Sequence, residues 1–141
     1  MLKNQLNPHF LFNSFNTLIN IIDKDKQMAM EFTEKLSDFY REIVLMQEKE
    51  MVTVEEEINL LKNYIYLQQK RFSNKLQLSV HLFDEHKKAG IPPLTLQLLA
   101  ENALKHNTVD ENNPLIIKIE SAQFFLIVSN NITKMNQKVR S

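Results

Sequence analysis

Two groups of polar residues in this sequence are suited to chemistry, and the first centres on His9. Asn7 can cap a helix and Pro8 suits its first turn, where a missing N–H costs nothing, so His9 is predicted to lie in that turn. Asn13 follows one helical turn later and can hold the imidazole ring or orient its proton. A histidine with an ordinary pKa of about 6.5 is largely neutral near pH 7 and can act as a nucleophile.

The second group lies in the stretch Leu96–His106, which is predicted to be helical. Helical spacing places Asn102 and His106 on one face, beside Lys105, and Glu101 precedes Lys105 at the spacing that favours an ion pair. An asparagine oxygen is a hard ligand suited to Mg²⁺, and lysine or histidine can neutralise phosphate oxygens. The face can therefore hold a metal–nucleotide pair. On helix chemistry alone, a face that is simply solvated remains the alternative.

Composition is ordinary for a globular chain and carries no overall charge. In 141 residues, 17 basic residues offset 17 acidic ones, so no net field favours nucleic acid or an anionic membrane. Zero cysteines exclude disulfides and thiolate metal sites. The single glycine, Gly90, excludes a glycine-rich phosphate loop within these residues. No apolar run approaches the roughly 20 residues that span a bilayer.

Three segments of the first half are predicted to be helices that position His9: 7–23, 27–48 and 54–72. The third begins after a capping-box pattern formed by Thr53 and Glu56. The second repeats apolar residues at spacings of three and four, at Met28, Phe32, Leu36, Phe39, Ile43 and Met46. The first has a polar stripe of His9, Asn13, Asn16 and Asn20. Its apolar stripe, predicted to be the buried side, is Leu11, Phe12, Phe15, Leu18, Ile19 and Ile22.

The periodicity changes after residue 74. Residues 76–82 alternate apolar and polar side chains, which predicts a half-buried strand. Pro92-Pro93 is predicted to open the helix that ends near His106. Segments 115–120 and 124–129 are predicted to be strands joined by a turn at Ser121-Ala-Gln.

These elements predict an α+β fold with a boundary between two parts. Residues 1–74 are predicted to be the helical part, and residues 75–141 the part that combines strands with a helix. The polar tail from Thr133 to Ser141 is predicted to be frayed.

Two segments, in this order, resemble the H box and N box of bacterial sensor histidine kinases of the LytS/YehU-like family. They are Asn-Gln-Leu-Asn-Pro-His-Phe-Leu-Phe-Asn and Pro-Pro-Leu-Thr-Leu-Gln-Leu-Leu-Ala-Glu-Asn-Ala-Leu-Lys-His. Between them, Tyr-Ile-Tyr-Leu-Gln-Gln-Lys-Arg-Phe, which ends at Phe72, is similar to the family's spacer. The resemblance implies that residues 1–74 are a helical dimerisation and phospho-acceptor region, built as a dimeric helical hairpin. It also implies that residues 75–141 are part of a GHKL-type ATP-binding α/β sandwich.

The same resemblance implies roles for individual residues. His9 would accept phosphate from ATP, and Asn102 would be the Mg²⁺ ligand. Lys105 and His106 would contact the nucleotide phosphates. The resemblance leaves open which group takes the proton of His9, because the next residue, Phe10, cannot act as a base.

The sequence departs from the family pattern near its end. Where many such kinases have an aspartate that reads the adenine amino group, followed by glycine, this chain has Ile-Val-Ser-Asn-Asn-Ile, so Asn130 or Asn131 would have to substitute. The glycine-bearing lid that should follow is missing, since Gly90 is the one glycine. We therefore expect a fragment, cut within the ATP-binding domain, that binds ATP poorly.

The preferred interpretation is the cytoplasmic transmitter part of a bacterial membrane sensor kinase. It implies a homodimer, a response-regulator partner, often of the LytTR type, and membrane helices elsewhere in the full protein. One alternative is a non-catalytic dimerisation and docking module with a vestigial ATP-binding fold. Another is a GHKL ATPase, but the position four residues before Asn102, where such enzymes place a general-base carboxylate, is Leu98.

Overall fold

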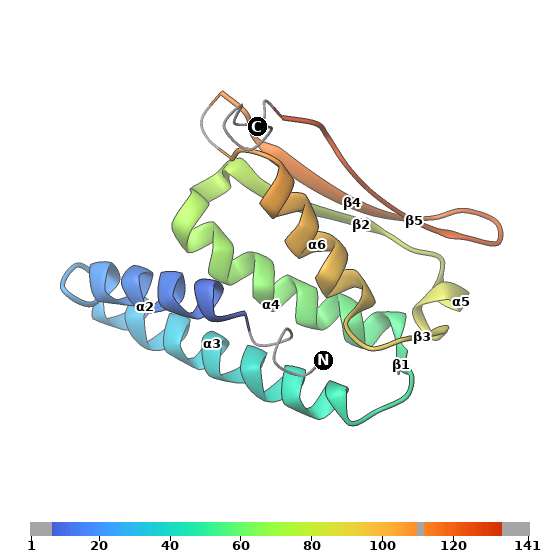
Figure 1. Ribbon diagram of the computed structural model, residues 1–141, viewed down its shortest axis with the longest axis horizontal. Coiled ribbons are helices and arrows are strands. Elements are labelled where there is room, and N and C mark those ends of the chain that lie inside the picture. Colours follow the sequence, from blue (N-terminus) through green and yellow to red (C-terminus); the bar gives the residue numbers. More distant parts are fainter. Residues whose placement is uncertain (1–6, 110–111, 134–141) are drawn as a thin grey trace.

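The computed structural model describes residues 7–109 and 112–133 and shows three layers (Figure 1). A hairpin of α2 (Pro8–Ile22) and α3 (Lys26–Gln47) packs on α4 (Val54–Phe72). Helix α4 lies beside α6 (Thr95–His106). On the side of α4 away from the hairpin, a three-stranded sheet contacts both α4 and α6. The predicted α+β class, with long helices preceding a sheet region, is confirmed.

Helix α2 begins where the sequence predicts. The Asn7 side chain accepts hydrogen bonds from the backbone N–H groups of His9 and Phe10, at 3.0 Å and 3.3 Å, and Pro8 takes the first helical position. The predicted buried side of α2 is wrong for the single chain. Phe10 and Ser14 face the core, whereas Phe12 is 66% exposed and Ile19 is 63% exposed.

Helices α3 and α4 supply most of the core beneath α2. Asp25 caps α3 by accepting from Met28 N–H at 3.0 Å. The capping box predicted at Thr53 and Glu56 is confirmed, with reciprocal bonds of 2.9 Å and 3.1 Å. The predicted α3 stripe is buried apart from Met28, which is half-buried. Because α4 contacts α3, α6 and the sheet, it fixes the hairpin relative to α6.

The sheet has the order β2-β4-β5. Strand β2 (Leu76–His81) is parallel to β4 (Leu115–Ser121), and β4 is antiparallel to β5 (Leu126–Asn130). All three strands were predicted, but the turn between β4 and β5 is longer than expected. It runs from residue 122 to residue 125, where the two backbones exchange hydrogen bonds of 2.8 Å and 3.4 Å.

Four short elements escape the sequence patterns. They are β1 (Val52–Thr53), β3 (Gly90–Ile91), α5 (Asp84–Lys87) and the 3₁₀ turn Ser73–Lys75. Strands β1 and β3 pair antiparallel and join the start of α4 to the segment that leads into α6. Two-residue strands are too short to show any periodicity.

Helix α6 begins at Thr95, two residues later than Pro92-Pro93 predicted. Leu94 takes the left-handed conformation, with φ at 67°, which turns the chain into the helix. No side chain of α6 caps this end. The carboxylate of Glu57 on α4 does so instead, accepting from Leu94 N–H at 2.5 Å and from Leu96 N–H at 2.8 Å.

At the end of the described chain, the predicted fraying is wrong for Thr133. This residue is buried, and its hydroxyl donates to the carbonyl oxygen of Thr108 at 2.8 Å. Its N–H donates to Asn107 Oδ1 at 3.1 Å, which ties the residues after β5 to the end of α6. Residues 134–141, the rest of the predicted frayed tail, lie outside the described residues.

Candidate functional site

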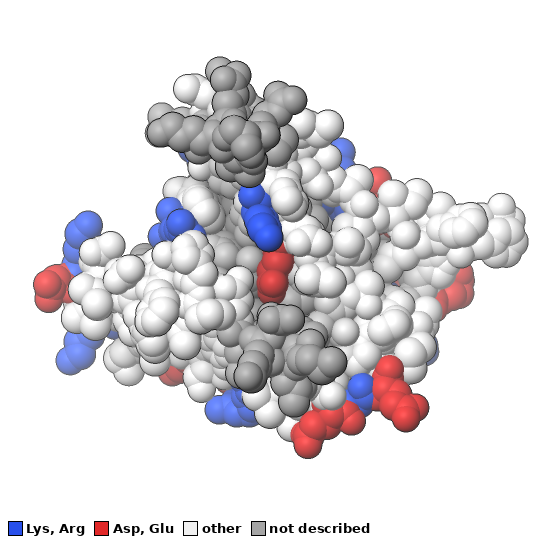
Figure 2. Space-filling model, in the orientation of Figure 1, with Lys and Arg blue, Asp and Glu red and all other residues white. Residues whose placement is uncertain are grey.

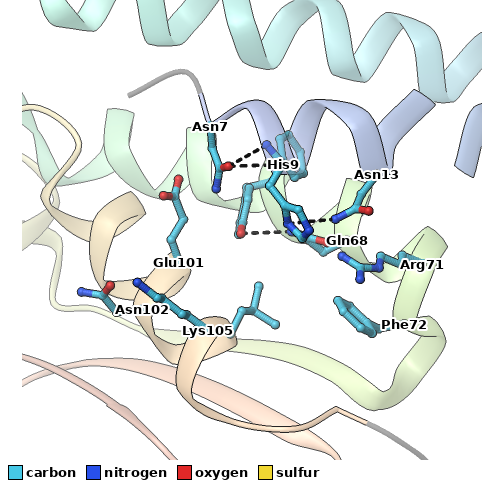
Figure 3. A pocket seen from close by; sticks show the side chains of 12 residues that line it. Asn7, His9, Asn13, Gln68, Arg71, Phe72, Glu101, Asn102 and Lys105 are labelled. Atoms are coloured by element: carbon cyan, nitrogen blue, oxygen red, sulfur yellow. Dashed lines mark hydrogen bonds between the residues drawn. The ribbon is translucent and has the colours of Figure 1, made fainter. Parts of the chain in front are cut away.

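A cavity of about 590 Å³ opens between the start of α2, the end of α4 and α6. His9 and Asn13 line it from α2, and Asn102 and Lys105 line it from α6 (Figure 3). Residues from both polar groups that the sequence analysis singled out, far apart along the chain, therefore face one space. Tertiary packing around α4 brings them together.

His9 is exposed, but the helix turn that carries it is anchored. The next residue, Phe10, is buried against the rings of Phe39 and Tyr64, with centroids 5.4 Å and 5.2 Å away. Tyr40 also contacts Phe10, at 6.2 Å. Aromatic packing on one side of the turn thus holds the imidazole on the other side, at the mouth of the cavity.

The ring of His9 has one hydrogen-bond partner within α2. Asn13 Nδ2 lies 3.3 Å from His9 Nδ1. In this orientation Nδ2 donates to Nδ1, and the proton of the neutral ring is then on Nε2. If the amide turns over, Asn13 Oδ1 accepts a hydrogen bond from Nδ1–H, and the lone pair of Nε2 is then free. Asn13 can therefore hold either tautomer of the ring.

The end of α4 forms the second wall of the cavity, with Tyr64, Gln68, Arg71 and Phe72. Gln68 Nε2 donates to Tyr64 Oη at 3.0 Å. Burial raises the pKa of Tyr64, so its phenol stays neutral at physiological pH. The guanidinium carbon of Arg71 lies 4.7 Å from the centroid of the Phe72 ring.

Helix α6 forms the third wall. Glu101 accepts a hydrogen bond from Gln97 Nε2 at 2.8 Å, and burial raises the pKa of its carboxyl. The predicted ion pair between Glu101 and Lys105 is not among those of the described residues. Asn102 and Lys105 are exposed on the cavity side. A nucleophile, an amide oxygen donor and a cation thus share one cavity.

The chain matches the family model described as "Histidine kinase" over residues 1–76. That range spans more than half of the chain and contains α2, α3, α4 and the residue that caps α6. The chain belongs to the histidine kinase family. The resemblance drawn from the two boxes is therefore confirmed at the level of the family.

Curated relatives agree with this assignment. The chain is 33% identical over 130 residues to "Sensor protein LytS" of Staphylococcus saprophyticus, covering 91% of this chain and 22% of that protein. It is 37% identical over 108 residues to "Sensor histidine kinase BtsS" of Escherichia coli, covering 77% of this chain and 19% of that protein. For "Sensor protein LytS" of Bacillus cereus, the identity is 38% over 105 residues, with coverages of 74% and 18%. The chain spans about a fifth of the length of these relatives.

The structure of this histidine kinase chain does not bring every predicted residue to the cavity. His106 is exposed at the end of α6, outside the cavity lining. Asn131 Oδ1 accepts from Ile116 N–H at 2.7 Å, and its Nδ2 donates to the carbonyl oxygen of Pro114 at 2.8 Å. Asn130 Nδ2 donates to the carbonyl oxygen of Asn131 at 2.7 Å. Contact of these three side chains with a nucleotide stays a prediction.

The sequence analysis assigned no functional role to four polar residues that line the cavity: Tyr64, Gln68, Arg71 and Glu101. Tyr64 and Arg71 lie in the spacer-like segment, but periodicity marks α4 only as a core helix there. Glu57 was also missed, because it follows two other glutamates in the first turn of α4 and looks like one more solvated charge.

Proposed function

We propose that this chain is the phospho-acceptor and partial ATP-binding portion of a two-component sensor kinase that phosphorylates itself on His9. The single observation that supports this most strongly is the shared cavity of His9, Asn102 and Lys105. ATP is the phosphate donor in this proposal, and the phosphoryl group passes from His9 to an aspartate of a response regulator.

The chemistry at His9 is a nucleophilic displacement. With Asn13 Oδ1 accepting a hydrogen bond from Nδ1–H, the lone pair of His9 Nε2 attacks the γ-phosphorus of ATP. A P–N bond forms, the bond from phosphorus to the bridging oxygen breaks, and ADP leaves with that electron pair. The ring keeps its Nδ1 proton in the hydrogen bond to Asn13 until water accepts it. Lys105 neutralises negative charge on the phosphate oxygens.

Magnesium fits this site through Asn102. Within residues 7–109 and 112–133, no group of three or more histidine, aspartate or glutamate side chains can hold a metal ion. Mg²⁺ in phosphoryl-transfer sites is commonly held by one or two side chains and by substrate phosphates. The exposed amide oxygen of Asn102 is a suitable donor of this kind, and the ion would supply charge neutralisation there.

A second copy of the chain fits the uncovered face of α2. This helix has no Lys, Arg, Asp or Glu, and Figure 2 shows a broad uncharged surface over it. Four large apolar side chains are exposed there: Phe12, Phe15, Ile19 and Ile22. Such a stripe is typical of helices that pair in a symmetric bundle. Sedimentation should show a dimer that Ile19→Asp dissociates and Asn16→Asp, on the polar stripe, does not. A monomeric parent chain would contradict this part of the proposal.

The response regulator and the cellular location are proposed from the family resemblance. The regulator is expected to carry a LytTR-type DNA-binding domain, and the chain is expected to lie on the cytoplasmic side of the membrane that holds the full-length sensor. None of the described helices is both long and apolar enough to cross a bilayer. Membrane attachment would therefore depend on segments other than these helices.

One observation favours a second candidate, a non-catalytic dimerisation and docking module. The side chain of Asn131, one of the two proposed adenine readers, is already bonded to the backbone of residues 114 and 116. In that case the cavity would be a remnant of an ATP site and His9 would have only a structural role.

Autophosphorylation separates the two candidates. The full-length protein that carries this sequence is incubated with γ-labelled ATP and Mg²⁺. The proposal predicts label that is lost in acid and kept in alkali, as expected for a phosphohistidine. His9→Gln should abolish this label, and His81→Gln, which changes a histidine on β2, should keep it. The docking module predicts no label in any of these proteins.

A further inference from the structure

Arg71 is a cationic residue of the cavity wall, and the proposed roles make no use of its charge. It lies in the last turn of α4, next to Phe72, and lines the cavity together with His9 and Asn13. Figure 3 shows its guanidinium on the same side of the cavity as the Asn13 amide and the His9 ring.

The guanidinium of Arg71 contacts an aromatic ring. Its carbon atom lies 4.7 Å from the centroid of the Phe72 ring, within the range of a cation–π contact. The N–H donors of a guanidinium lie at the edge of its plane, where they can bind an anion while the contact with the ring is kept. Arg71 therefore combines an aromatic contact with N–H donors suited to an anion.

Within residues 7–109 and 112–133, no carboxylate forms an ion pair with Arg71. Among these residues, Glu101 is the carboxylate that lines the cavity, and it accepts a hydrogen bond from Gln97. With the cation of Lys105 on the α6 wall, two positive charges from different helices face the space next to His9.

We propose that Arg71 binds the phosphoryl group carried by His9. This inference rests on the proposed function, because it requires phosphate on that ring. A phosphoryl dianion has oxygens that match the two-pronged donor geometry of a guanidinium. Arg71 on α4 then binds phosphate at the acceptor, His9. Lys105 lies near Asn102 on α6 and binds the phosphates of the nucleotide.

A chemical phosphate donor tests Arg71 without ATP. Phosphoramidate phosphorylates the imidazoles of the chain: a P–N bond to the ring nitrogen forms as the P–N bond of the donor breaks and ammonia leaves. The pH titration of the phosphoryl group on His9 is followed by ³¹P NMR. Phosphoryl groups on His81, His86 and His106 serve as internal references, and His9→Gln assigns the His9 signal.

The proposal predicts that the phosphoryl group on His9 loses its last proton at a pH about 1 unit lower in the parent chain than in Arg71→Ala, because a nearby cation favours the dianion. Arg71→Lys keeps the charge but loses the planar guanidinium, so it should change the titration less than Arg71→Ala does. Arg41→Ala removes the same type of charge from the exposed face of α3 and should change nothing. Identical titrations in the parent chain and in Arg71→Ala would overturn the proposal.

A second probe covers the case in which phosphoramidate does not modify His9. Inorganic phosphate is added to the unmodified chain, and the side-chain Nε–H resonance of Arg71 is followed by NMR. The proposal predicts a saturable shift of this resonance and no such shift for Arg41. Absence of an Arg71 shift would overturn it.

The outcomes for Arg71 and for the proposed function can be told apart. If the titration depends on Arg71 but the full-length protein takes no label from ATP, the kinase function is rejected and the phosphoryl-binding role of Arg71 is kept. Normal ATP-dependent labelling with no effect of Arg71 on the titration would reject only the role of Arg71.

Discussion

Asn13 Nδ2 lies 3.3 Å from His9 Nδ1, one helical turn further along α2. Both residues belong to the same rigid turn, so this contact does not depend on the rest of the cavity. It gives the ring a partner that can accept or donate a hydrogen bond but is not a base near neutral pH. Asn13 is therefore not the group that finally takes the proton of His9.

The first prediction concerns Asn13. Asn13→Leu should lower the rate of His9 phosphorylation in the full-length protein about tenfold, which corresponds to about 1.4 kcal/mol, near the net value of one hydrogen bond. Asn13→Asp should keep most of the rate, because a carboxylate also accepts a hydrogen bond from Nδ1–H. Asn16→Leu is the matched control on the polar stripe. An unchanged rate in Asn13→Leu would show that the contact has no role in catalysis.

The second prediction concerns Glu57, which is only 1% exposed and caps α6 from α4. Glu57→Ala leaves the N–H groups of Leu94 and Leu96 buried without an acceptor. Each such loss costs about 1–3 kcal/mol, so the free energy of unfolding should fall by at least about 2 kcal/mol. Urea unfolding measures this change.

The matched control for Glu57 is Glu55→Ala, which removes an exposed carboxylate from the same turn of α4. It should change the free energy of unfolding by less than about 0.5 kcal/mol. Equal effects of the two substitutions would mean that the loss comes from the charge of the first turn and not from the cap.

Much of the fold follows from sequence patterns, and the exceptions have physical reasons. The stripe of α3 and the capping box of α4 were predictable because each is satisfied within a few residues of the chain. The cap of α6 was not, because Glu57 is far from Leu96 in sequence. The buried side of α2 was misassigned because its apolar stripe is not covered within one chain, and Phe10 enters the core instead.

The candidate site was predictable only in part for the same reason. His9 and Asn102 stand in local motifs, so their residue types and spacing reveal them. Arg71 and Glu101 become cavity residues only when α4 and α6 pack side by side. Periodicity reports which face of a helix is apolar, but it does not report which helix that face meets.

The third prediction concerns Tyr40 and pH. Burial, with a lesser effect from the charge of Glu101, raises the pKa of Tyr40 to about 12. In the unfolded chain the same phenol ionises near the ordinary tyrosine pKa of 10.0. The folded state therefore resists this ionisation. The stability that results is fully present below about pH 10 and is lost as the pH rises toward about 12.

Tyr40→Phe tests this account. The part of the chain that the structure describes gives Tyr40 Oη no hydrogen-bond partner, so the substitution should cost little at neutral pH. Above pH 10 the variant should lose stability less steeply than the parent chain does. Urea unfolding at a series of pH values measures both slopes, and parallel curves would refute the assignment.

The fourth prediction concerns ATP binding by this chain alone. The one glycine, Gly90, lies in β3 beside β1 and does not line the cavity. The cavity therefore lacks the glycine backbone that can approach a phosphate closely. Calorimetry with Mg-ATP should show no binding at micromolar concentrations. Micromolar affinity abolished by Asn102→Ala would contradict this prediction and would mean that the walls described here are sufficient for the nucleotide.

The position of the phosphate tests the central claim most directly. The full-length protein is incubated with Mg-ATP, digested at neutral or alkaline pH, and the modified peptide is fragmented in a mass spectrometer. We predict one phosphate, on the imidazole of His9, in the peptide that begins α2. A phosphate on His81, His86 or His106 with His9 unmodified would contradict the account, and so would an unmodified protein.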